Sequence, residues 1–144
     1  MKRIFTRTAL AAAGTLLGVI GGALILAPRD FLETSHVFIE NDPGLMSELA
    51  APAGLLLITS ALMLCGAIRI RLADLALSAG AIVYGSYGAG RLISMALHGL
   101  PSDSLVAAMA IELAVAAILA GLRVTGSSAK PLSDVEDDPC GAIV

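Results

Sequence analysis

The 144-residue sequence contains no tryptophan, and aromatic residues make up only 3% of it. Charged residues are also scarce, at 15%, whereas a typical soluble domain has about 25%. The net charge of -3 argues against a nucleic-acid-binding protein, because that function needs a basic surface. The two cysteines, Cys65 and Cys140, lack the spacing of metal ligands, so we expect free thiols, no metal site and no bound cofactor.

Hydrophobic residues, in contrast, make up 57% of the chain and form long runs. A membrane-spanning helix needs about 20 such residues, so the pattern predicts an all-α integral membrane protein built as a four-helix bundle. We expect a transmembrane domain over residues 1–124 and a disordered, acidic cytoplasmic tail over residues 125–144. The four predicted spans cover approximately residues 8–27, 45–68, 75–97 and 104–122.

The polar segment between the first two spans, Pro28 to Gly44, is the longest predicted loop. Within it Phe31, Phe38 and Ile39 follow helical spacing, which predicts a short helix lying in the membrane interface. Arg29 is the only basic residue that the predicted topology places on this side. Because basic residues collect on the cytoplasmic side, we expect both termini in the cytoplasm. The residues that set this orientation are Lys2, Arg3, Arg7, Arg69, Arg71, Arg123 and Lys130.

Several glycines recur at helical spacing within the predicted spans. Gly14, Gly18 and Gly22 share one face of the first span, which allows another helix backbone to approach closely. Gly85 and Gly88 offer the same possibility on the third span. We interpret these glycines as helix-packing positions, within the chain or between two copies of it.

Three ionisable residues, Glu48, Arg91 and Glu112, interrupt the apolar spans. A charge near the middle of a span costs about 2.5 to 3.5 kcal/mol, so each should face the bundle interior and find a partner. With a rise of about 1.5 Å per residue, Arg91 and Glu112 lie roughly 10 and 12 Å below the outer ends of their spans. These matching depths predict an ion pair between Arg91 and Glu112. Glu48, roughly 5 Å deep, is predicted to be a second acceptor for Arg91.

Other polar groups are expected beside this pair. Tyr84, Tyr87, Arg91, Ser94 and His98 are spaced as one helical stripe of the third span. Pro52 also removes the helical hydrogen bond to the carbonyl group of Glu48. Together these groups predict a polar pocket that opens outward. Such a cluster can fix helix register, or it can hold a small molecule, an ion or a proton.

The sequence contains no nucleophile elbow, zinc-binding helix, phosphate loop or dinucleotide fingerprint, so we expect no catalytic residues. Several local motifs stand out instead: Leu26-Ala27-Pro28, the run Ser47 to Gly54, Gly90-Arg91, His98-Gly99-Leu100-Pro101 and Glu112-Leu113. Together these motifs resemble the four-helix bacterial membrane proteins grouped as domain-of-unknown-function family 4345. The resemblance implies a bacterial inner-membrane protein of broadly DoxX-like architecture. It implies no reaction.

Three functions remain open at this stage. The first is a non-enzymatic membrane module or accessory subunit, which would bind another membrane protein or a second copy of itself. The second is a carrier or receptor for a small solute that uses Arg91 together with Glu48 and Glu112. The third is a quinone-linked redox accessory protein, with Tyr84, Tyr87 and His98 around the site.

Overall fold

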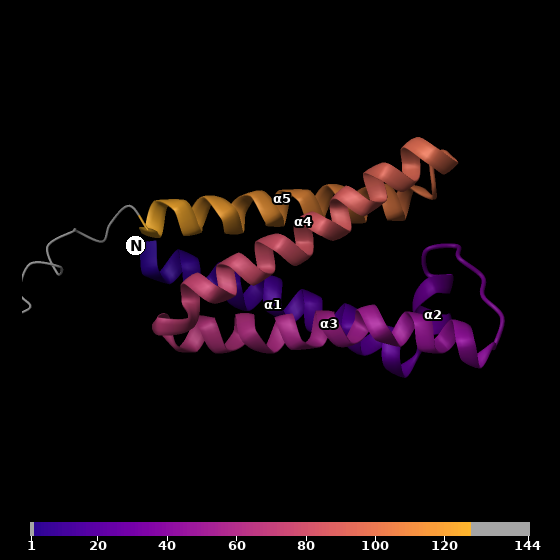
Figure 1. The fold of residues 1–144 in the computed structure, drawn as a ribbon, viewed down its shortest axis with the longest axis horizontal. Helices are drawn as coiled ribbons and strands as arrows, with labels where there is room; N and C mark the ends of the chain where they lie inside the picture. The colour runs from indigo at the N-terminus through magenta and orange to yellow at the C-terminus, as the bar shows by residue number, and fades with distance from the viewer. Residues whose placement is uncertain (1, 128–144) are drawn as a thin grey trace, which may run out of the picture.

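The computed structural model describes residues 2–127, and these residues are helical with no β-strand among them (Figure 1). Residues 128–144, most of the predicted tail, lie outside the described part. The predicted tail started too early, because the last helix continues through Ser127. The elements are α1 (Lys2–Leu26), α2 (Pro28–Glu33), α3 (Pro43–Ile68), the 3-10 helix η1 (Ile70–Leu72), α4 (Ala73–His98) and α5 (Asp103–Ser127).

Local sequence signals explain where these helices begin and end. Pro43 occupies the first turn of α3, and the side chain of Asp42 accepts a hydrogen bond of 2.8 Å from the backbone N–H of Leu45. α2 also starts with a proline, Pro28. α4 ends at His98, and the residue that follows, Gly99, has a φ of 93°, in the left-handed region that favours glycine.

The helix between the first two long helices is shorter than the sequence pattern predicts. α2 ends at Glu33, and the chain then turns through Thr34 and His36, so Phe38 lies outside the helix. The hydroxyl of Thr34 donates to the carbonyl oxygen of Phe31 at 2.6 Å, a local bond that competes with helix continuation. The apolar spacing was therefore a poor guide to the length of this helix.

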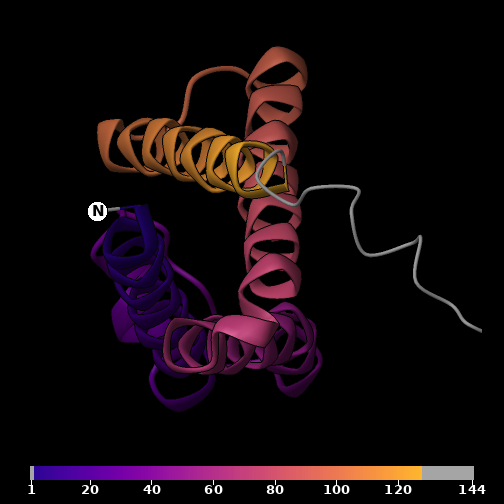
Figure 2. The same ribbon diagram turned by 90° about the vertical axis from the view of Figure 1, so that its left-hand side faces the viewer.

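The four long helices form two antiparallel hairpins, α1 with α3 and α4 with α5 (Figure 1). Seen from the end, α4 crosses from the α1–α3 pair to α5 (Figure 2). The buried residues of α4 accordingly lie between Ala73 and Gly88, and none follows Gly88. Most of the core lies where α1, α3 and the first part of α4 meet, around Leu10, Met63 and Leu77.

Glycines bring α1 and α3 close together. A Cβ atom at Gly14 would lie 3.0 Å from the Cβ of Met63, and one at Gly18 would lie 2.7 Å from the hydroxyl oxygen of Ser60. The third close contact is made by Gly21, because a Cβ at Gly22 would meet nothing within 4 Å. The predicted packing role therefore fits Gly14 and Gly18, whereas Gly22 faces away from α3.

Three of the described helices are long and apolar enough to cross a membrane: α1, α3 and α5. Such helices are compatible with a membrane protein. α4 is equally long, at 26 residues, but it is less apolar because its second half contains Ser86, Tyr87, Arg91 and Ser94. A fourth span therefore stays a prediction at this point.

The packing of α1 on α3 gives a test with a matched control on the same helix. We expect Gly18→Leu to lower the stability by about 1–3 kcal/mol, because the new side chain would overlap Ser60. Gly22→Leu adds the same side chain in open space, so the thermal midpoint should stay unchanged or rise. Thermal unfolding in detergent, followed by circular dichroism, measures both variants. Equal losses in the two would contradict this packing.

Candidate functional site

The site is centred on an ion pair between α4 and α5. The Nε atom of Arg91 donates to both carboxylate oxygens of Glu112, at 3.2 Å to Oε1 and 3.0 Å to Oε2. The side chain of Glu112 is 13% exposed and that of Arg91 is 35% exposed. The structure thus brings together the two charges whose depths match in the sequence.

A close helix contact next to the ion pair holds α4 and α5 in register. A Cβ atom at Gly88 would lie 2.6 Å from Cδ2 of Leu113, so any larger residue would force the Leu113 side chain to move. Gly88 is three residues before Arg91, and Leu113 directly follows Glu112. The contact therefore sets the spacing across which the two charges meet. A Cβ atom at Gly85 would lie 3.7 Å from the Cβ of Ala116, which is an ordinary contact distance.

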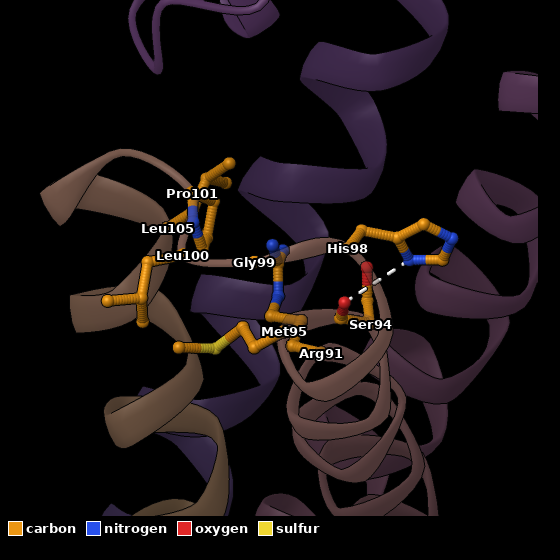
Figure 3. Close-up of a pocket in the computed structure, with 8 residues that line it drawn as sticks. All are labelled: Arg91, Ser94, Met95, His98, Gly99, Leu100, Pro101 and Leu105. Carbon is orange, nitrogen blue, oxygen red and sulfur yellow. Dashed lines mark hydrogen bonds between the residues drawn. The ribbon is translucent and has the colours of Figure 1, made fainter.

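The two Nη groups of Arg91 make no hydrogen bond within residues 2–127, because Nε supplies both contacts to Glu112. They border a pocket of about 280 Å³ at the turn between α4 and α5, which Arg91 lines together with Ser94 and Leu105 (Figure 3). A second, more open pocket of about 450 Å³ lies along the flank of α4. Arg91 and Ser94 line this pocket as well, with Ser86, Tyr87 and Gly90.

His98 lines the first pocket, but its imidazole ring points away from the Leu100–Pro101 turn (Figure 3). Its Nδ1 atom lies 3.2 Å from the carbonyl oxygen of Ser94. Because a carbonyl can only accept, Nδ1 is the donor in this contact. The imidazole of His98 therefore makes a local contact one turn back along α4, and Arg91 is the guanidinium-bearing residue of the pocket.

The two tyrosines of the predicted stripe have different surroundings. Tyr84 is 2% exposed, and its hydroxyl donates to the carbonyl oxygen of Ala13 on α1 at 2.7 Å. It therefore joins α4 to α1 and does not face the Arg91 pockets. Tyr87, by contrast, lines the flank pocket. The redox hypothesis required Tyr84, Tyr87 and His98 to surround one site, and they do not.

Glu48 is not a second acceptor for Arg91, so this prediction was wrong. Its side chain is exposed and forms no ion pair within the described residues. The start of α3 and the end of α4 are far apart in both ribbon views (Figures 1 and 2). The carbonyl group that Pro52 leaves free is on the same part of α3, and it is also far from Arg91. Two residues at similar depth in neighbouring helices need not touch, and here the two hairpins diverge toward this end.

Sequence reasoning placed Ser94 in the polar stripe but missed Ser86 and Gly90 as lining residues of the flank pocket. Ser86, Gly90 and Ser94 are four residues apart, so they share a face of α4 next to Arg91. That spacing could have identified them. The turn residues Met95, Leu100 and Leu105 carry no such pattern, because their position depends on how the turn folds.

Helices of this length and composition, with a charged pair between two of them, define an all-helical domain compatible with a membrane protein. The chain belongs to the family described as "Domain of unknown function (DUF4345)", which matches residues 5–122. The resemblance noted in the sequence is thereby confirmed. No curated protein matches the chain. No solved structure matches it either.

The ion pair predicts a non-additive response to mutation. Arg91→Gln leaves the carboxylate of Glu112 shielded from water without its partner, so we expect a loss of about 1–3 kcal/mol. Adding Glu112→Gln removes the second charge and should restore part of the stability. Thermal unfolding of both single variants and the double variant gives the coupling energy. A coupling energy of zero would contradict a pair that stabilises the fold.

Proposed function

We propose that this chain is a four-span, non-enzymatic module of the bacterial inner membrane that binds a polar or anionic ligand at Arg91. The observation that carries the proposal is the guanidinium group, held on one side by Glu112 and open to two pockets on the other. A charged group with free donors in an apolar helix needs an acceptor. An anion in either pocket supplies one.

The arrangement of the helices supports four spans. α4 has 26 residues, a length of about 39 Å, which exceeds the apolar thickness of a bilayer, about 30 Å. The loop after α2 and the turn between α4 and α5 lie at the same end of the molecule, and the hydroxyl of Ser102 donates to the carbonyl oxygen of Ser35 at 3.0 Å. Both connections should therefore be on the same side of the membrane.

The distribution of basic residues supports the direction of insertion. The end opposite these connections contains the N-terminus of α1, the η1 turn and the C-terminus of α5 (Figure 1). Arg7, Arg69 and Arg123 belong to these segments, whereas Arg29 belongs to α2 at the other end. By the positive-inside rule, both termini face the cytoplasm, and α2 lies at the outer interface.

The topology can be tested by labelling single cysteines in intact cells. In a chain whose own cysteines are replaced by serine, Ser102→Cys should react with a membrane-impermeant maleimide added from outside. Thr125→Cys, at the end of α5, should react only after the cells are made permeable. Protection of Ser102→Cys in intact cells would show that α4 does not cross the membrane.

Two features give less support to self-association through the glycines of α1 and to a quinone site. Gly14 and Gly18 pack against α3 within the chain, so they are not free to bind a second copy. Tyr84 binds α1, which removes it from a shared quinone site with Tyr87 and His98. Ligand binding at Arg91 is therefore the function that the geometry favours.

Ligand binding at Arg91 is tested by thermal unfolding in detergent with added inorganic phosphate, acetate or phosphatidylglycerol. At least one of these should raise the melting temperature of the wild-type protein, and the effect should be absent in Arg91→Gln. Arg29→Gln removes the same charge from α2 and should behave as the wild type. Equal stabilisation of the wild type and Arg91→Gln would contradict the proposal.

A further inference from the structure

The two pockets beside Arg91 differ in what they offer a ligand. The pocket at the turn lies at the outer end of α4, where the Nη groups supply positive charge. The flank pocket extends from Arg91 back along α4 toward Ser86, so it is deeper in the proposed membrane. Because Arg91 and Ser94 line both, the two pockets adjoin. A ligand could occupy both with its charged end at the turn.

The surface of the flank pocket is more apolar than polar. The hydroxyl of Ser86 already donates to the carbonyl oxygen of Val83 at 2.9 Å. Gly90 contributes only backbone, and a Cβ atom there would meet nothing within 4 Å. Tyr87, Arg91 and Ser94 complete the lining. This mainly apolar groove suits an alkyl chain whose polar end lies beside Arg91.

The position of Arg91 along α4 matches the membrane level of a lipid headgroup. Its Cα lies seven residues before His98, about 10 Å from the outer end of the helix. The long side chain of an arginine can extend toward the interface from that depth. A lipid whose chain lies in the flank pocket would bring its phosphate to the same level.

We infer that the site binds a membrane lipid that carries a phosphate group, with the phosphate on the Nη groups of Arg91 and an acyl chain along Ser86, Tyr87 and Gly90. This inference rests on the proposed ligand-binding function and specifies its ligand. Glu112 is a positioning residue, because it accepts from Nε and leaves the Nη groups without a hydrogen bond within residues 2–127. Arginine suits this role, because its planar group can bind two oxyanions on different sides.

Three probes separate the parts of such a lipid: dioctanoyl phosphatidylglycerol, glycerol 3-phosphate and dioctanoylglycerol. The first has both the phosphate and the chains, the second lacks the chains, and the third lacks the phosphate. Native mass spectrometry of the full chain in detergent measures binding of each. We expect only the phosphatidylglycerol to bind, and Arg91→Gln to bind it about tenfold more weakly or worse, the equivalent of one lost charged hydrogen bond.

The groove is tested by filling it. Gly90→Leu places a side chain in the open space of the flank pocket and should weaken phosphatidylglycerol binding by about tenfold, since it displaces part of the acyl chain. Gly121→Leu is the matched control, because a Cβ at Gly121 on α5 also meets nothing within 4 Å. It should bind the lipid as the wild type does. If Arg91→Gln does not fold, the double variant with Glu112→Gln replaces it.

The outcomes distinguish this inference from the proposed function. If glycerol 3-phosphate binds in an Arg91-dependent way and Gly90→Leu has no effect, the ligand is a small solute and the lipid inference is wrong. If Arg29→Gln weakens lipid binding as much as Arg91→Gln, the attraction is a general charge effect and the inference also fails. If no anion binds through Arg91, both the inference and the proposed function fail.

Discussion

The contact between Arg91 and Glu112 determines the arrangement of the half of the molecule that contains the turn between α4 and α5. In that half, α4 and α5 meet at this pair and at the close approach of Gly88 to Leu113. In an apolar environment, helices gain little from excluding water from one another, so close packing and polar contacts decide which faces meet. The carboxylate of Glu112 also fixes which nitrogen of the guanidinium is used, and thereby leaves the Nη groups available.

The other half of the molecule is held together differently. α1 and α3 pack closely at Gly14, Gly18 and Gly21, and two buried hydroxyls donate to neighbouring carbonyl oxygens of α1. These hydroxyls belong to Ser60 on α3 and Tyr84 on α4, so three helices share this junction. Because α4 leaves the junction at an angle, its last turns are separated from α3 (Figure 2). The well-packed half therefore positions α4, and the divergence leaves room for pockets beside Arg91.

The sequence predicted those features that depend only on how far along a helix a residue lies. The four long helices follow from apolar length, and the pairing of Arg91 with Glu112 follows from equal depth on consecutive helices. Lateral position could not be predicted, because depth says nothing of which side of the bundle a residue occupies. Glu48 was therefore assigned to a site on the other hairpin, and Tyr84 was placed in a polar stripe although the tilt of α4 directs it to α1.

The use of Nε in the ion pair also bears on whether Arg91 has a purely structural role. If Arg91 served only to fix helix register, its remaining donors would still need acceptors, because hydrocarbon offers none. Within the described residues, Glu112 accepts from Nε alone. The neighbouring residues of α4 in the flank pocket, Tyr87 and Gly90, supply no further carboxylate. In the proposed topology, water and lipid phosphate are the acceptors near this end of α4. An arginine whose charge is neutralised on one side still has directional donors on the other. In that topology, the same pair that joins α4 to α5 presents a binding group to the membrane surface.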